Sequence, residues 1–222
     1  MAEHMQDEEQ LEAIKQWWQE NKVSVIAAFV VAVGGTLGWS QYTDYSASKA
    51  AAAANSYDAV VEQKNQLGTD GLAELVGELR EEHAGSVYSG LASMQLASVA
   101  VGDGNYELAI EELTQVVSDL DPASTMGQMA QLRLARALAA GDREDDAIRI
   151  LKGGSASFPV SFSQALGDIH LAAGREAEAL DAYRMAQSAS LDMGRGPGLL
   201  ELKVTALELR LGQADVADGA LQ

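Results

Sequence analysis

The chain has 222 residues, of which 47% are hydrophobic and 22% are charged, and its formal net charge is −18 at pH 7. Phosphate groups repel so acidic a protein, which excludes nucleic acid and anionic lipid surfaces as partners. The sequence contains no cysteine, which excludes a thiol nucleophile, a thiolate metal site and the acylated cysteine of a lipoprotein.

Residues 1–22 are expected to form a short acidic tail on the cytoplasmic side of a membrane. Carboxylates gather near its start, at Asp7, Glu8, Glu9 and Glu12. Apolar residues follow at helical spacing, namely Leu11, Ile14, Trp17 and Trp18. The tail is therefore predicted to be amphipathic.

Residues 23–42 form the predicted transmembrane helix. The run from Val23 to Trp39 contains no charged residue. Aromatic rings, which favour the two headgroup layers, flank it at Trp17, Trp18, Trp39, Tyr42 and Tyr45. A bilayer core about 30 Å thick needs roughly 20 apolar residues in a helix, and the run supplies them together with its aromatic margins.

Two other interpretations of this run fit it less well. A core helix of a soluble domain seldom has aromatic residues at both ends. A cleaved signal peptide has a basic start and a small-x-small cleavage site, whereas this run ends in bulky Leu37 and Trp39. Lys15 and Lys22 precede the run and Lys49 follows it, which favours a signal anchor with its N-terminus in the cytoplasm.

Residues 43–85 are expected to form a linker helix and an N-terminal helical pair. Ser46 to Leu67 is rich in alanine and has apolar residues on a helical period, so the membrane helix is expected to continue into it. Gly68 is expected to end that helix. An apolar stripe predicts a second helix over Gly71 to His83.

Residues 86–222 repeat as helix pairs. Small residues recur at an offset of twelve, which lets paired helices approach closely, in Ala97 and Ala109, Ala135 and Ala147, and Gly167 and Ala179. The second members are 38 and then 32 residues apart, which brackets the period of about 34 residues of a tetratricopeptide repeat. The turns between paired helices hold Gly102 and Gly104, Gly141 with Asp142, and Gly174, and glycine tolerates the left-handed backbone that ends a helix. The sequence predicts an all-α, tetratricopeptide-like solenoid of helix pairs with a C-terminal capping helix, preceded by a single N-terminal transmembrane helix.

Residues 160–191 resemble a tetratricopeptide unit in detail, with the expected small, leucine and tyrosine positions at Leu166, Gly167, Gly174, Ala179, Tyr183 and Ala186. The layout of nearly the whole chain is also similar to the YfgM family of ancillary translocon subunits. The residues that carry this resemblance are the span ending in Gly38-Trp39 and the segments Tyr88–Ala97 and Gln131–Arg136.

The resemblance implies a single-pass protein of the bacterial inner membrane with a periplasmic tetratricopeptide domain. It implies association with the SecYEG translocon and with a membrane-anchored periplasmic prolyl isomerase and chaperone of the PpiD type, and hence a role in the export of secretory proteins. A membrane-tethered scaffold for envelope or outer-membrane assembly stays open as an alternative, because the same groove is suited to other proteins.

No catalytic, metal or cofactor site is expected. The three histidines, His4, His83 and His170, are not paired at i, i+4 and lie outside any zinc motif. His170 occupies a position where the repeat usually has an aromatic residue, which favours a packing role. The glycines from Gly194 to Gly198 are interrupted by Pro197 and follow no predicted strand, so they are read as a loop between helices rather than a phosphate site.

A protein-binding groove on the first helices of the pairs is the expected functional site. The repeat register directs seven residues toward it, namely Leu91, Met94, Met129, Leu132, Arg136, Gln164 and Asp168. Arg136 is suited to bind a carboxylate of the partner. Packing of the four apolar residues against a neighbouring helix is an equally good interpretation. Gly34 and Gly38, which have Gly-x-x-x-Gly spacing, predict a contact with another membrane helix.

Overall fold

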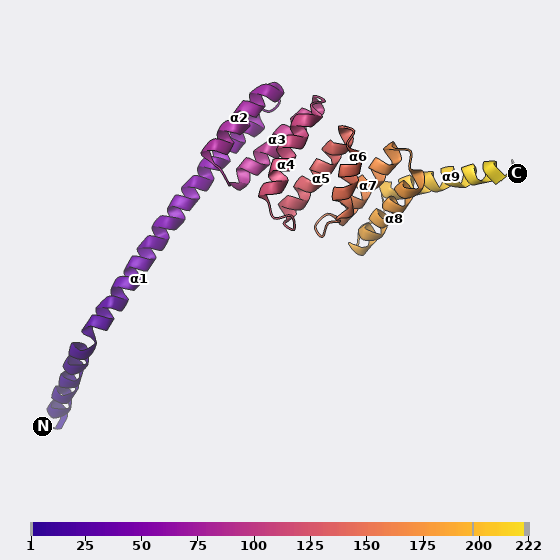
Figure 1. Cartoon of the computed structure of the whole chain (residues 1–222). Coiled ribbons are helices and arrows are strands. Elements are labelled where there is room, and N and C mark those ends of the chain that lie inside the picture. Colours follow the sequence, from indigo (N-terminus) through magenta and orange to yellow (C-terminus); the bar gives the residue numbers. More distant parts are fainter. Residues whose placement is uncertain (1, 197, 220–222) are drawn as a thin grey trace. The chain divides into compact units, whose positions relative to one another are not determined.

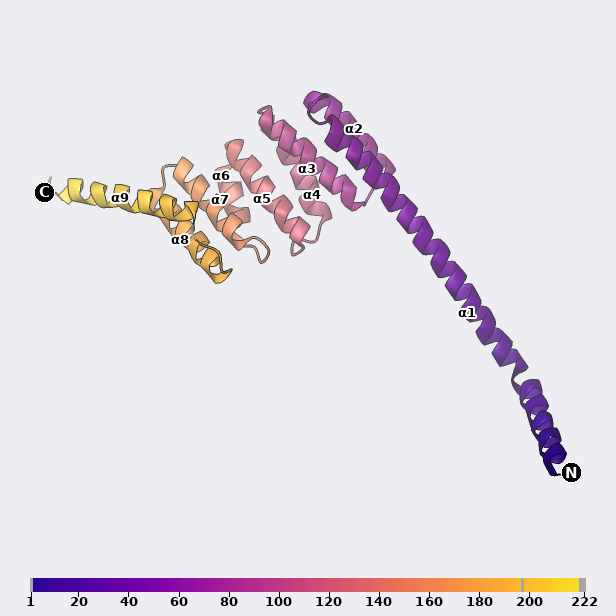
Figure 2. The ribbon, with the colours of Figure 1, turned by 180° about the vertical axis from the view of Figure 1, so that it is seen from behind.

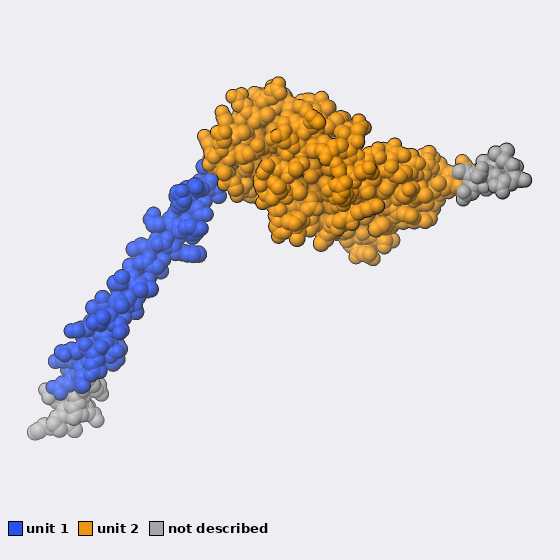
Figure 3. All heavy atoms as spheres, in the orientation of Figure 1, with its two compact units in different colours: residues 1–52 blue, residues 53–222 orange. Residues whose placement is uncertain are grey.

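The computed structural model describes residues 2–196 and 198–219, and these residues form nine α-helices and no strand. The helices are α1 (Ala2–Gln63), α2 (Gly68–Glu82), α3 (Val87–Gly102), α4 (Tyr106–Asp119), α5 (Thr125–Ala140), α6 (Glu144–Lys152), α7 (Pro159–Ala172), α8 (Glu176–Asp192) and α9 (Leu199–Gly219) (Figure 1). The prediction of an all-α fold is confirmed. The chain divides into two compact units, residues 1–52 and residues 53–222 (Figure 3).

The first unit is the N-terminal part of α1. This helix contains an 18-residue window with a mean hydropathy of 1.8, none of which is buried, and it is long and apolar enough to cross a membrane. Val23 is 73% exposed, Phe29 68% and Trp39 70%. A helix with apolar side chains exposed on all sides is suited to lipid, because lipid tails cover such surface and water does not. The helix is therefore not a core helix of the described fold.

The second unit begins where α1 acquires a buried face. Ala53 is 1% exposed and Val60 is fully buried against Leu72 and Val76 of α2. α1 ends at Gln63, earlier than the predicted end at Gly68. Gly68 instead opens α2 with φ of 66°, a left-handed conformation that costs glycine little.

From α2 to α9 the helices follow one another side by side in chain order, as both views of the ribbon show (Figure 1 and Figure 2). The pairs are α3 with α4, α5 with α6, and α7 with α8. The small residues predicted at their contacts are at most 1% exposed, namely Ala97, Ala109, Ala135, Ala147 and Ala179. Gly167 is buried too, against the ring of Tyr183. The predicted repeat of close helix contacts is confirmed.

The same backbone hydrogen bond closes the turn within each pair. The N–H groups of Asn105, Arg143 and Arg175 donate to carbonyls five residues earlier, over 2.8, 2.8 and 2.9 Å. This is the bond of a helix that ends in a left-handed residue. The left-handed residue is Gly104 in the first turn, Asp142 in the second and Gly174 in the third, with φ of 77°, 59° and 73° respectively.

Asp142, and not Gly141, therefore carries the left-handed conformation in the middle turn. Gly141 meets a different requirement, since a Cβ placed on it would lie 3.2 Å from Tyr106 Cβ and 3.3 Å from Ile110 Cδ1 of α4. Aspartate tolerates a positive φ better than most residues with side chains. A glycine is therefore needed at position 141 because α4 of the neighbouring pair approaches closely, and not because of the backbone conformation.

Helix α9 packs on the last pair, α7 and α8, and covers an apolar surface of α8. Leu200, Val204 and Leu207 are buried in a cluster with Tyr183 and Leu180 of α8. The opposite side of α9 faces solvent, with Leu202 67% exposed. A terminal helix of this kind shields the apolar face that the next repeat would otherwise cover.

Candidate functional site

Two adjacent hollows lie along the first helices of the pairs. The α3/α5 hollow has a volume of about 290 Å³ and is lined by Met94, Ala97, Ser98, Val101, Leu113, Arg133, Arg136 and Ala137. The α5/α7 hollow has a volume of about 280 Å³ and is lined by Arg136, Ala139, Ala140, Glu144, Ala165, Asp168, Ile169 and Ala172. Arg136 lines both hollows, which makes one groove of two compartments.

The α3/α5 hollow combines an apolar floor with a basic rim. Met94, only 1% exposed, and Leu113, 2% exposed, form part of the floor. The rim is formed by Arg133 and Arg136, three residues apart on α5 and both exposed. Residues at this spacing are neighbours on a helix surface. The hollow thus offers a surface for an apolar group beside two guanidinium groups.

The α5/α7 hollow contains carboxylates that already have partners. Asp168 forms an ion pair with Lys203 of α9 and accepts a hydrogen bond of 2.6 Å from the hydroxyl of Tyr183. Lys203 Nζ also lies 4.8 Å from the centre of the Tyr183 ring. Burial, together with this hydrogen bond, raises the pKa of Tyr183 above its ordinary value, so the phenol stays protonated and continues to donate. Glu144 is paired with Arg175 over 3.3 Å.

Three of the seven predicted groove residues, Met94, Arg136 and Asp168, line the hollows. Leu132, 8% exposed, is a member of the main core cluster, and Leu91 packs against that cluster. For these two leucines the interpretation as helix packing describes the structure. Met129 and Gln164, both half-buried, line neither hollow.

Sequence reasoning missed Arg133. The repeat register places Leu132 toward the groove, but the packing of α5 turns Arg133 to the rim instead. A usable signal was present in the sequence. Two arginines three residues apart on one helix are unusual in a chain with 33 acidic and only 15 basic residues.

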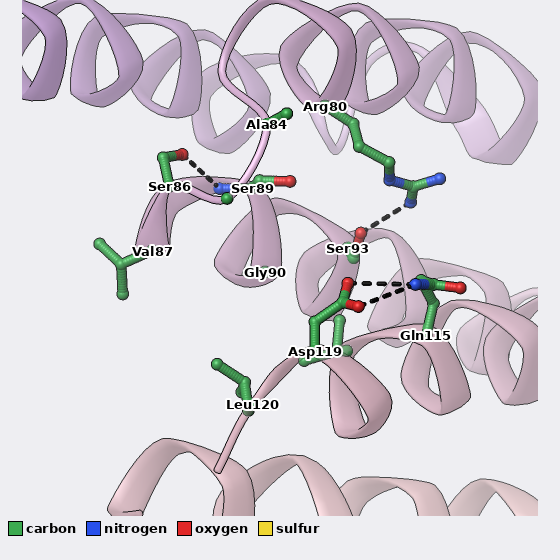
Figure 4. Close-up of a pocket in the computed structure, with 12 residues that line it drawn as sticks. Arg80, Ala84, Ser86, Val87, Ser89, Gly90, Ser93, Gln115, Asp119 and Leu120 are labelled. Carbon is green, nitrogen blue, oxygen red and sulfur yellow. Dashed lines mark hydrogen bonds between the residues drawn. The ribbon is translucent and has the colours of Figure 1, made fainter.

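A larger hollow of about 740 Å³ lies between the end of α2, the start of α3 and the end of α4 (Figure 4). Its polar groups bind one another. The guanidinium of Arg80 donates to Ser93 Oγ over 2.8 Å and forms an ion pair with Glu112, and the Gln115 amide donates to both carboxylate oxygens of Asp119 over 3.0 and 3.1 Å. This hollow therefore has no unpaired cation to offer a ligand.

A family model described as "Tetratricopeptide repeat-like domain" matches residues 15–209, and thus covers most of the chain. The chain belongs to the tetratricopeptide repeat-like domain family. The solved structure of the nearly identical TPR-like repeats of a putative kinesin light chain from Podosopora anserina has the same repeat fold, with a TM-score of 0.55 and 18% identity over 78% of this chain and 90% of that one.

Relatives of this repeat protein that are named "Ancillary SecYEG translocon subunit" confirm the resemblance to the YfgM family. The relative from Aggregatibacter actinomycetemcomitans is 29% identical over 84% of this chain and 91% of its own length. That from Haemophilus influenzae is 26% identical over the same shares. That from Neisseria gonorrhoeae is 24% identical over 94% of this chain and its own entire length.

His170 has a packing role in this repeat protein. It is 8% exposed, and its Nδ1 accepts a hydrogen bond of 2.9 Å from Arg175 Nε. Burial lowers the pKa of His170, and the positive charge of Arg175 lowers it further. A neutral ring is needed here, because a protonated Nδ1 cannot accept from the guanidinium. Among the described residues, no group of three or more histidine, aspartate or glutamate side chains is arranged to hold a metal ion.

Proposed function

We propose that this protein is an ancillary subunit of the Sec translocon, a membrane-anchored adaptor without catalytic activity. The observation that carries this proposal is the shared name of relatives that this chain matches over 91% of their length or more. The repeat domain supports an adaptor role, because stacked helix pairs present extended surfaces for binding other proteins. The apolar helix near the N-terminus supports anchoring in the membrane that holds the channel.

We further propose that the N-terminus lies in the cytoplasm and the repeat domain in the periplasm. Lys15 and Lys22 before the membrane span, against Lys49 after it, favour this orientation. Anchoring then concentrates the groove where secretory chains leave the channel, since tethering raises the effective concentration of a binding site without any new contact.

We also propose association with a membrane-anchored prolyl isomerase and chaperone of the PpiD type, which the family resemblance implies. A groove that binds protein segments is suited to association with another protein such as this isomerase. Met94 in its floor is an unbranched, adaptable side chain, and methionine surfaces accommodate varied partners.

Crosslinking in living cells tests the proposal. Cells that produce the tagged full-length protein are crosslinked briefly and extracted in mild detergent, and the captured proteins are identified by mass spectrometry. We expect the translocon channel and a membrane-anchored prolyl isomerase. A tagged single-span protein with an unrelated periplasmic domain serves as the control for nonspecific capture. Recovery of outer-membrane assembly factors with the channel absent would overturn the proposal and favour an envelope scaffold.

A further inference from the structure

The arginines of the α3/α5 hollow differ from the others in having no acidic partner. The chain has nine arginines, and six of them form ion pairs with described carboxylates. Three arginines have none within 4.0 Å among the residues that the structure describes, namely Arg133, Arg136 and Arg195. Two of these three share the rim of one hollow. In a chain of net charge −18, Arg133 and Arg136 form a local site of positive charge that is suited to an acidic ligand.

Neither of the other hollows has two arginines without a described acidic partner in its lining, since the α5/α7 hollow shares only Arg136. Arg80 in the larger hollow is neutralised by Glu112, and the carboxylates of the α5/α7 hollow are paired with Lys203 and Arg175. Charge-assisted hydrogen bonds are the strongest that a protein surface offers, and planar guanidinium groups bind carboxylates through two parallel bonds. The electrostatic attraction of an acidic ligand is therefore concentrated at Arg133 and Arg136.

The floor of the hollow limits the kind of anion. It is apolar, built in part from Met94, Val101 and Leu113, so the ligand carries an apolar group next to its negative charge. A volume of about 290 Å³ holds one or two side chains of a segment that crosses the groove. Nucleic acid and anionic membranes present many negative charges at once, which the chain as a whole repels.

We propose that the α3/α5 hollow binds a polypeptide segment in which an apolar side chain lies between two acidic residues. The apolar side chain packs on Met94 and Leu113, and the two side-chain carboxylates pair with Arg133 and Arg136. This inference rests on the proposed function as a protein adaptor and adds the chemistry of the segment that the groove recognises.

Fluorescence anisotropy with the full-length protein in detergent micelles tests the inference. The probes are two short fluorescein-labelled peptides with Gly-Ser flanks and amidated C-termini, one with the core Asp-Leu-Glu and one with the core Lys-Leu-Lys. The amide removes the terminal carboxylate as a source of binding. We expect the acidic peptide to bind at least about tenfold more tightly, and its affinity to fall as salt is added. Equal affinities, or tighter binding of the basic peptide, would overturn the inference.

Matched charge reversals locate the site. R133E/R136E changes the charge by four units at the rim, and it should weaken binding of the acidic peptide at least about tenfold. R149E/K152E makes the same change at the same spacing on α6, where both side chains are exposed and outside the hollow, and it should leave the affinity within about twofold. Equal losses in the two variants would show a general charge effect and refute the site. R133Q/R136Q repeats the test without new negative charge if the reversal impairs folding.

The peptide assay and the crosslinking experiment fail independently. Selective peptide binding without recovery of the channel would leave the hollow as a recognition site and reject the translocon assignment. Recovery of the channel by both the wild type and R133E/R136E, together with peptide binding that does not depend on the arginines, would keep the translocon assignment and reject the inference.

Discussion

Gly167→Ala tests whether close packing at one position determines the stability of the last repeat. A Cβ on Gly167 would lie 2.6 Å from both Cδ1 and Cε1 of Tyr183, and 3.1 Å from its Cγ. These atoms belong to a rigid ring that is fully buried and whose hydroxyl is hydrogen-bonded to Asp168. The ring cannot move away without losing that bond or displacing α8 from α7.

The expected cost follows from two opposing effects. Overpacking of a filled core costs about 1–3 kcal/mol, and a contact this short with a rigid ring lies at the upper end. Alanine in place of glycine in a helix gains about 1 kcal/mol. We therefore expect a net loss of about 1–2 kcal/mol in the free energy of unfolding, which corresponds to a fall in Tm of roughly 2–8 °C for a domain of this size.

Gly77→Ala is the matched control. Gly77 lies within α2, and a Cβ there would meet no atom within 4 Å, so the variant should be as stable as the wild type or up to about 1 kcal/mol more stable. Urea unfolding of the full-length proteins, followed by circular dichroism, measures both variants. Gly167→Ala with wild-type stability or better would refute the packing argument. The double variant Gly167→Ala/Tyr183→Leu should lose less stability than the sum of the losses in the two single variants, because the clash couples the two positions.

Three further predictions concern the groove, the membrane helix and the response to pH. M129E/R136E should weaken the recovery of partner proteins after crosslinking. Thermal stability should stay nearly unchanged, because Met129 is half-buried and Arg136 is exposed. A large loss of thermal stability would show instead that these side chains belong to the core. G34L/G38L places two large side chains where no atom lies within 4 Å of a Cβ, and it should reduce the recovery of partner proteins that contact this face of the membrane helix. Unchanged recovery would refute the predicted contact between membrane helices. The pKa of His170 is lower in the folded than in the unfolded chain, so wild-type stability should fall as the pH decreases from about 6.5 toward the folded pKa. His170→Gln should lose this part of the pH dependence, and identical pH profiles in urea unfolding would contradict the prediction.

The apolar N-terminal helix and the positions of the helix pairs along the chain can be predicted from the sequence, because both depend on residues that are close together in the chain. An uncharged run such as Val23 to Trp39 forms a helix that is long and apolar enough to cross a membrane, whatever the rest of the chain does. The constant offset between Ala97 and Ala109, or between Ala135 and Ala147, is imposed by the lengths of the helices and their turn. Such spacings can be read directly from the sequence, and the helix pairs of the structure lie at the positions that the spacings predict.

Tertiary packing decided which residues face the groove. Helix α5, for example, packs against its own partner α6 and against α4 and α7 of the neighbouring pairs, and these contacts fix its rotation about its axis. A rotation of one residue, about 100°, exchanges a core position for a rim position. For this reason Leu132 lies in the core, and Arg133, which the repeat register did not direct to the groove, lines the hollow beside Arg136. Local spacing along the chain thus specifies where the helices begin and end, whereas the side chains that they present to a partner depend on the packing of neighbouring pairs.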